Sequence, residues 1–362
     1  MAKAYKKYGN PSSYNNAGRL AREAIELARL SIARFLSARG EEIVFTSSGS
    51  EANNLALVGA LDGKKGTVLT TPIEHPSVLE PLKKLKKIAV QYISINKDGF
   101  VDTVDFSEKI SSECRLVSVM YANNEIGTIQ PIRKLAKIIA DYNKVHGTKI
   151  LFHVDACQAT GYLDMNVQHL GADLVTFNGS KIYGPRSIGV LYVRRGTKLT
   201  PIISGGSQER GLRAGTENVS AIVGLAEAIS IIKSDESTKI SIVRDYAISQ
   251  IEKVLPQALI NGPRGFERLA NNISICIPKV SSENLLLELD KHSISAGSGS
   301  ACTSHAVEPS HVLKAIGVSS EYINGALRFS LGRDTTKKDI NYLVKTLATI
   351  VPQLIKRYAR LR

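Results

Sequence analysis

The chain has 362 residues, more than one typical domain, and its hydrophobic content of 43% is ordinary for a globular protein with a large core. No apolar run approaches the length of about 20 residues that a membrane helix needs, and the basic N-terminus lacks the apolar stretch of a secretory signal. The formal net charge of +14 favours acidic partners, but no basic motif interleaved with aromatic residues is present, so we do not expect nucleic acid as the primary ligand.

The first two thirds of the chain alternate between short apolar strands and amphipathic helices. We expect helices at 17–37, 53–61, from about 77, at 132–145, 217–233 and 238–255. We expect strands at 42–47, 67–71, 89–95, 115–121, 150–154, 173–177 and 188–194. Such alternation predicts an α/β fold in which helices flank a mainly parallel sheet.

From about residue 256 the pattern changes to that of a smaller α/β lobe. Strands are expected at 272–278, 294–296 and 325–331, with helices at 282–289 and 337–358. We therefore expect three parts: an N-terminal segment at 1–14, a large domain at 15–255 and a small C-terminal domain at 256–362.

The four cysteines lie far apart and include no CxxC pair (Cys114, Cys157, Cys276 and Cys302). This spacing argues against structural zinc and against a disulfide framework, and it favours a reducing compartment. We therefore expect a cytoplasmic protein without a metal site.

Polar side chains gather where the predicted strands end (Ser50, His75, Asn124, Asp155, Gln158 and Lys181). In a parallel sheet the carboxyl ends of the strands form the edge at which ligands bind, so these side chains should converge. The strand at 42–47 also runs into a Ser-Gly-Ser turn and a helix, whose free N–H groups would form a phosphate cradle. An ordinary serine N-cap would have the same sequence.

Lys181 lies in GADLVTFNGSKIYGP, between a predicted buried strand and a tight turn. We expect this placement to restrict the side chain and to desolvate the amine in part. Desolvation lowers the pKa of lysine and makes it a nucleophile able to form a Schiff base. A loop lysine that reaches solvent is the alternative.

Two residues stand out in the C-terminal lobe. Cys302 lies in a run of Gly, Ser and Ala, a mobile and exposed setting in which a thiol can act as a nucleophile if its neighbours lower its pKa. Arg328 lies in a predicted strand and could bind a carboxylate through two parallel hydrogen bonds. A surface cysteine without a role and a peripheral ion pair are the alternatives.

Motifs spread through nearly the whole chain resemble the NifS/IscS-like cysteine desulfurases, which are pyridoxal-phosphate (PLP) enzymes of the class V aminotransferase fold (fold type I). The matching stretches are GNPSS (9–13), EEIVFTSSGSEANNLAL (41–57), EHPSV (74–78), YANNEIGTIQPI (121–132), HVDACQATG (153–161), SKIYGP (180–185), GLRAGTENV (211–219), SGSACTSHAVEPSHVL (298–313) and LRFSLGR (327–333). They follow in the family's order, and the SGSACTS motif is similar to the group with the longer cysteine loop.

The resemblance implies roles around the PLP ring. Lys181 would bond the cofactor covalently, Asp155 would pair with the pyridine nitrogen, and His75 would stack on the ring and help with proton transfers. Gln158 would hydrogen-bond the ring oxygen. Asn124, which we favour over the adjacent asparagine, would contact the ring oxygen or the substrate.

The resemblance also implies how the phosphate is held. Gly49 and Ser50 would bind it at their helix start, and Thr216 would reach the phosphate of the other subunit, which implies a homodimer. The family usually has a histidine directly before the lysine and a serine two positions earlier, where this chain has Ser180 and Asn178. Both replacements can donate hydrogen bonds, so we expect PLP binding to persist.

The implied reaction converts L-cysteine to L-alanine. Arg328 would bind the substrate carboxylate, and Cys302 would receive the sulfur as a persulfide and pass it to acceptors for iron–sulfur cluster assembly or tRNA thiolation. Alternatives are another fold-type I PLP enzyme, such as a selenocysteine lyase or an aminotransferase, or a silenced PLP fold that acts as a binding partner. The resemblance also implies an N-terminal strand with a small-Thr-Thr element, which has no counterpart before Tyr8.

Overall fold

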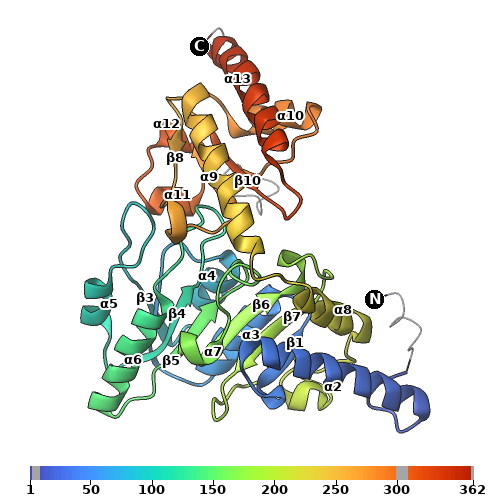
Figure 1. Cartoon of the computed structure of the whole chain (residues 1–362). Helices are drawn as coiled ribbons and strands as arrows, with labels where there is room; N and C mark the ends of the chain where they lie inside the picture. Colours follow the sequence, from blue (N-terminus) through green and yellow to red (C-terminus); the bar gives the residue numbers. More distant parts are fainter. Residues whose placement is uncertain (2–8, 299–308, 360–362) are drawn as a thin grey trace. The chain divides into compact units, whose positions relative to one another are not determined.

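The structure is a computed structural model that describes residues 1, 9–298 and 309–359 (Figure 1). The chain divides into two compact units, each treated by itself below. Unit 1 comprises Met1–Ile93, Thr103–Tyr121 and Gln130–Lys233, and unit 2 comprises Ser94–Asp102, Ala122–Ile129 and Ser234–Arg362. The expected domain boundary after residue 255 stays a prediction.

Unit 1 is built on a seven-stranded sheet in the order β1-β7-β6-β5-β4-β2-β3. Its strands are β1 (Ile43–Thr46), β2 (Gly66–Thr70), β3 (Ile88–Tyr92), β4 (Cys114–Met120), β5 (Leu151–Asp155), β6 (Leu174–Asn178) and β7 (Gly189–Val193). The pairs from β3 through β2, β4 and β5 to β6 are parallel, and β7 runs antiparallel to both β6 and β1. All strands except β7 therefore point the same way, which confirms the predicted mainly parallel α/β sheet.

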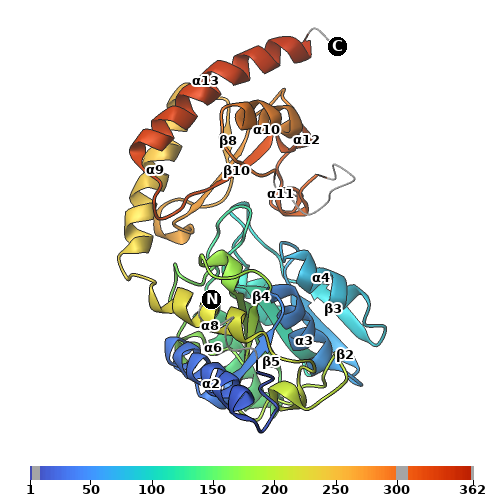
Figure 2. The same ribbon diagram turned by 90° about the vertical axis from the view of Figure 1, so that its right-hand side faces the viewer.

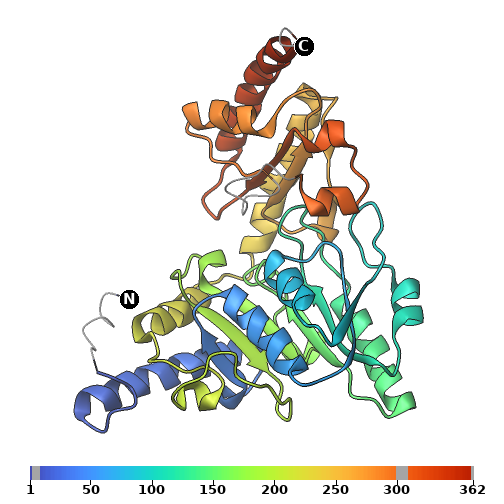
Figure 3. The same cartoon turned by 180° about the vertical axis from the view of Figure 1, so that it is seen from behind.

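Helices cover both faces of this sheet. The helices of unit 1 are α2 (Asn16–Leu36), α3 (Gly49–Leu61), α4 (Pro76–Lys83), α5 (Thr103–Lys109), α6 (Ile132–His146), α7 (Val167–Leu170) and α8 (Val219–Ser230). Figure 3 shows α3 lying across the face of the sheet that is turned away from the viewer in Figure 1. The short helices α5 and α7 are not predicted from the sequence, because a helix of one or two turns is too short to show a periodic pattern of apolar residues.

Helix α3 is the central helix of the core. Its alanines and leucines are buried around most of its circumference, because the helix packs on the sheet with one side and on α4 with another. At Gly59 a side chain would meet the backbone oxygen of Thr200 at 2.6 Å, so only glycine allows this close approach. The first turn of α3 is thereby fixed relative to the strand ends beside it.

Unit 2 holds a three-stranded antiparallel sheet in the order β10-β9-β8. Its elements are α9 (Glu236–Val254), β8 (Leu259–Ile260), β9 (Asn272–Cys276), α10 (Ser282–Lys291), α11 (His311–Ala315), α12 (Ser320–Ile323), β10 (Ala326–Ser330) and α13 (Lys337–Ala359). The long helices α9 and α13 pack side by side (Figure 2). The strand predicted at 294–296 is wrong, because only Gly297 pairs there, through a single bridge to Arg328.

None of the helices that the structure describes is both long enough and apolar enough to cross a membrane.

Candidate active site

The turns after β1, β2, β5 and β6 carry most of the predicted site residues of unit 1. Because these strands run in one direction, their carboxyl ends lie at one edge of the sheet. The residues at this edge are Gly49, Ser50, His75, Asp155, Gln158, Asn178, Ser180 and Lys181. The predicted convergence of polar strand ends is therefore found for this set.

Asp155, the last residue of β5, is a buried carboxylate held by two donors. The side-chain amide of Asn53 donates to its Oδ2 at 2.7 Å, and the backbone N–H of Cys157 donates to its Oδ1 at 3.0 Å. Asn53 comes from the middle of α3 and is itself buried. These bonds fix both oxygens, so the carboxylate faces the sheet edge in one orientation.

His75 is connected to the same asparagine through Ser77. The Asn53 amide donates to the Ser77 hydroxyl at 2.8 Å, and that hydroxyl lies 2.7 Å from His75 Nδ1. Nδ1 also accepts the backbone N–H of Ser77, as His75 is the N-cap of α4. Since Nδ1 is an acceptor, a neutral His75 carries its proton on Nε2.

The N-terminus of α3 forms the second half of the site. The Ser48 side chain caps the helix by accepting from Glu51 N, and the first-turn N–H groups of an α-helix have no partner within the helix. A side chain at Gly49 would lie 2.8 Å from Cys157 Sγ and 2.9 Å from Asn178 Nδ2. Only glycine therefore allows Cys157 and Asn178 to approach the start of the helix this closely, beside its free N–H groups and the positive end of the helix dipole.

Asn178 lies beside the start of α3 and contacts Ser180. Ser180 Oγ donates to Asn178 Oδ1 at 3.2 Å, and Asn178 Nδ2 lies 3.6 Å from Cys157 Sγ. Burial and the negative charge of Asp155 raise the pKa of the Cys157 thiol well above its ordinary value, while Lys181 acts in the opposite direction. Cys157 is therefore a neutral thiol close enough to Asp155 and Lys181 to respond to both charges.

Lys181 ends a single 3₁₀ turn, Gly179–Lys181, directly after β6. Lys181 is exposed in the single chain, as expected for the alternative of a loop lysine that reaches solvent. The reason is that the turn lifts Lys181 beyond the buried strand end, whereas Ile182 points back into the core. The amine remains positioned by a short, fixed turn.

Thr216 belongs to a segment that is anchored to the start of α3. Arg213 Nε lies 2.9 Å from Glu51 Oε1, and Ser47 N donates to Glu51 Oε2 at 2.9 Å. Although burial opposes the change, the bonds from Arg213 and Ser47 lower the pKa of Glu51. Thr216 itself is exposed, and Gln158 is half-buried.

Unit 2 carries Asn124 and Arg328. The neighbouring Asn123 is buried, and its Oδ1 accepts the backbone N–H groups of Glu125 at 2.8 Å and Ile126 at 3.0 Å. The oxygen of Asn123 is thus used within its own turn, which favours Asn124 as the ligand-facing asparagine. Arg328 Nη1 donates to the backbone oxygen of Asn124 at 3.1 Å. Cys302 lies outside the described residues.

Sequence reasoning missed Asn53, Ser77 and a buried acid, Glu74. Burial raises the pKa of Glu74 to about 8, even though Thr71 Oγ1 and Met120 N donate to its Oε1 at 2.7 and 3.0 Å. A polar residue inside an otherwise apolar helix or between buried strand residues is the signal that could have found these positions. Their partners become visible only in the folded chain.

The residues of unit 1 fit PLP by their chemistry. They offer an amine for its aldehyde, a fixed carboxylate for its ring nitrogen, and hydroxyls, an amide and a helix N-terminus for its phosphate. Gly49 allows the Asn178 amide to lie close to that helix N-terminus. Within the described part of the chain, Asn53 Oδ1 is buried without a hydrogen-bond partner, and no group of three or more His, Cys, Asp or Glu could hold a metal ion.

Comparison with known proteins identifies the class. The model of the class-V aminotransferase family matches residues 1–343. Together with the mainly parallel sheet and the lysine turn at its carboxyl edge, this match defines a PLP-dependent enzyme of fold type I.

Individual relatives show which enzymes of this class the chain is similar to. The chain is 44% identical over 356 residues to the cysteine desulfurase IscS of Dictyoglomus turgidum, covering 96% of this chain and 89% of the relative. It is 41% identical over 355 residues to cysteine desulfurase IscS 1 of Archaeoglobus fulgidus, covering 96% and 91%. A solved NifS-like protein is 34% identical with a TM-score of 0.88, covering 96% of this chain and 93% of that one. The chain belongs to the cysteine desulfurases of the class-V aminotransferase family.

Proposed function

We propose that this protein removes sulfur from L-cysteine, releases L-alanine, and retains the sulfur as a persulfide on Cys302. The observation that carries the proposal is the Asp155 carboxylate, fixed by Asn53 and Cys157 at the same sheet edge as the exposed Lys181 amine. A carboxylate and an amine held in this way match the two ends of PLP, and the relatives named above are cysteine desulfurases.

In this proposal the residues of unit 1 hold the cofactor. Lys181 would bind its aldehyde carbon, Asp155 its ring nitrogen, and Gln158 its ring oxygen. Gly49, Ser50, Asn178 and Ser180 bind the phosphate. Bound PLP supplies an electron sink for the negative charge that develops at the substrate Cα.

His75 would stack on the ring and would donate from Nε2, because its Nδ1 accepts the backbone N–H of Ser77. Lys181 would take the proton from the substrate Cα and return it when alanine forms. Arg328 binds the substrate carboxylate, and Asn124 contacts the ring oxygen or the substrate.

The sulfur transfer then involves Cys302. Its thiolate sulfur bonds to the substrate sulfur, the substrate carbon–sulfur bond breaks with its electron pair remaining on carbon, and that carbon is protonated to give alanine. A nucleophilic acceptor for iron–sulfur cluster assembly or tRNA thiolation would then bond to the outer sulfur of the persulfide, and the S–S bond would break to give back the Cys302 thiolate. The proposal includes a homodimer in which Thr216 reaches the partner's phosphate site. It also includes a cytoplasmic location, which agrees with the free thiols of Cys114, Cys157 and Cys276.

A reconstitution experiment tests the function. Purified protein loaded with PLP should be yellow and should release alanine and sulfide from L-cysteine in the presence of a dithiol. Cys302→Ala should keep the colour and lose sulfide release, whereas Lys181→Ala should lose the chromophore of the covalently bound cofactor. A wild-type protein that PLP cannot reconstitute would contradict the proposal.

A further inference from the structure

Glu125 is a buried acid of unit 2 to which none of the roles above has been assigned. It is 5% exposed, and its Oε2 accepts the hydroxyl of Ser310 at 2.5 Å. Ser310 is 4% exposed and also accepts Leu313 N at 3.2 Å as the N-cap of α11, so its hydroxyl proton is directed to Glu125. Carboxylate and hydroxyl thus form a defined, desolvated pair.

This pair fixes one end of the segment that contains Cys302. Ser310 lies two residues after the segment 299–308, and Gly297 lies two residues before it. Gly297 is also fixed, because its N–H donates to Arg328 O at 2.9 Å and its carbonyl accepts Arg328 N at 2.6 Å. Both flanks of the segment are therefore bound to described residues of the same unit.

The two attachments meet at Asn124 and Glu125. Arg328 Nη1 donates to the backbone oxygen of Asn124, the residue directly before Glu125. Arg328, which we assign to the substrate carboxylate, is therefore bound to Asn124. Ser310 is bound to the next residue of the same loop, Glu125. A displacement of this loop would change both together.

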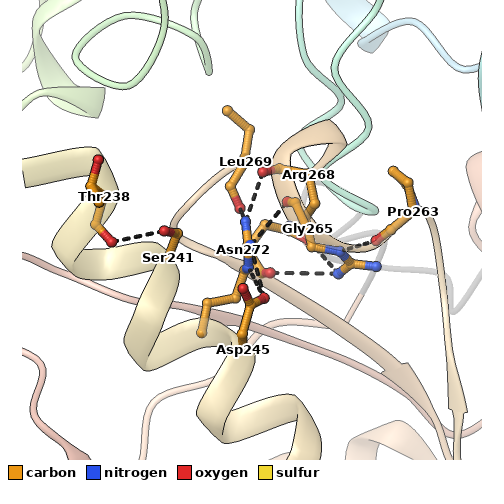
Figure 4. Close-up of polar contacts among 9 residues, drawn as sticks. Thr238, Ser241, Asp245, Pro263, Gly265, Arg268, Leu269 and Asn272 are labelled. Atoms are coloured by element: carbon orange, nitrogen blue, oxygen red, sulfur yellow. Dashed lines mark hydrogen bonds and ion pairs between the residues drawn. The ribbon is translucent and has the colours of Figure 1, made fainter.

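Buried polar contacts keep the loop in place. Asn272 Nδ2 donates to Glu125 O at 3.0 Å, and Asn272 Oδ1 accepts from Arg268 at 3.2 Å. Figure 4 shows the surrounding network, in which Arg268 also donates to Pro263 O at 2.7 Å, while the carbonyls of Arg268 and Leu269 accept from Arg244. This support makes the position of Glu125 a property of the fold of unit 2.

We propose that Glu125 is a positioning residue for sulfur transfer: by accepting the hydroxyl of Ser310, it fixes the C-terminal flank of the Cys302 segment relative to Arg328. The inference rests on the proposed function. Glu125 does not touch the reacting atoms in this assignment, so its loss should slow transfer to Cys302 while leaving cofactor and substrate binding intact.

The test uses PLP-loaded Glu125→Ala, Ser310→Ala, the double variant and Ser310→Thr. Persulfide on Cys302 is followed by mass spectrometry in a single turnover, and L-cysteine binding is followed by the change in PLP absorbance. Each alanine variant should slow transfer by about tenfold, the scale of a lost hydrogen bond to a carboxylate, with KM changed by less than about threefold. The double variant should be no slower than either single variant, because both remove the same interaction.

Ser310→Thr is the conservative control, since it keeps both the hydroxyl and the helix cap and should restore most of the rate. Wild-type transfer rates in both alanine variants would overturn the proposal. So would a parallel loss of PLP absorbance and L-cysteine binding, which would assign Glu125 and Ser310 a purely structural role. A wild-type protein that forms no persulfide would instead overturn the proposed function, and this inference with it.

Discussion

The candidate site depends on single residues whose partners are far away in the sequence. Asn53 is the clearest case, because one side-chain amide holds both Asp155 and the Ser77 hydroxyl beside His75. The carboxylate proposed for the ring nitrogen and the histidine proposed for the ring face are therefore held by the same helix residue. Asn54, its neighbour, donates to Ser50 O one turn earlier in the same helix.

Glu74 supplies a prediction at the residue scale. Burial raises its pKa from an ordinary value of 4.5 to about 8, so the folded chain binds a proton that the unfolded chain releases between these pH values. The free energy of unfolding should then fall as pH rises through this range. In wild type the free energy of unfolding should fall by up to about 1.4 kcal/mol per pH unit. Glu74→Gln imitates the protonated acid, so its free energy of unfolding should not show this fall.

The measurement is thermal unfolding of wild type and Glu74→Gln at pH values from about 5 to 8 and at matched PLP occupancy, the range being set by the raised pKa. The melting temperatures of the two proteins should be similar at about pH 5 and should differ increasingly toward about pH 8, with the glutamine variant the more stable. A constant difference across the range would show that Glu74 titrates normally.

At the scale of elements, the first turn of α3 determines what the site can hold. Gly49→Ala would put a methyl group 2.8 Å from Cys157 Sγ and 2.9 Å from Asn178 Nδ2, so it would displace Asn178, a residue assigned to the phosphate. We expect PLP affinity to fall at least tenfold and stability to drop by about 1–3 kcal/mol. Absorbance titration with PLP and thermal unfolding measure the two effects.

Gly40→Ala is the matched control for this change. A methyl group there would lie 3.4 Å from a Leu30 side-chain carbon, which is an ordinary contact. PLP affinity should be unchanged. If Gly49→Ala bound PLP as tightly as Gly40→Ala does, the phosphate would have to lie elsewhere.

A buried ion pair joins α2 to the 3₁₀ segment Gln208–Gly211. Arg29 Nη2 lies 2.7 Å from Glu209 Oε1, and Glu209 Oε2 also accepts Phe45 N at 2.8 Å. Glu209 and Arg210 have positive φ angles of 47° and 58°, an unfavourable conformation for residues other than glycine. We infer that the ion pair holds this segment, which precedes Arg213 and Thr216, in its strained conformation.

Arg29→Met should therefore destabilise the protein by about 3–5 kcal/mol, because it leaves the Glu209 charge buried without its partner. Arg133→Met is the control, since Arg133 pairs with Asp164 at the surface and its loss should cost less than about 1 kcal/mol. Urea unfolding of the two variants compares the costs directly. Equal losses would show that Glu209 is neutralised by another group.

For the whole molecule, the proposed homodimer means that each PLP site would contain residues of both chains. If Thr216 acts on the partner's phosphate site, a mixed dimer of Thr216→Ala and Lys181→Ala chains holds one site with both residues intact and one site with neither. Mixed chains should therefore regain a PLP site with wild-type affinity, which neither variant has alone. Absorbance titration of the mixture measures this gain, and sedimentation establishes the dimer.

If each chain builds its site from its own Thr216, the mixture will show only the average of the two variants. Sedimentation as a species of 39.2 kDa would contradict the dimer itself. Restored affinity in the mixture therefore requires both the dimer and the assignment of Thr216.

The fold class could be predicted from the sequence, and so could the place of Asp155 and Lys181 at the ends of β5 and β6. Apolar strands and amphipathic helices leave strong periodic patterns, and motifs such as HVDACQATG and SKIYGP are local, so their place at strand ends could be predicted. The direction of β7, the exposure of Lys181 and the contacts of Asn53 and Glu125 were decided only by the tertiary structure. The physical reason is that burial and hydrogen bonding depend on which distant segments meet, as when Ser310 donates to Glu125 across 185 residues of chain.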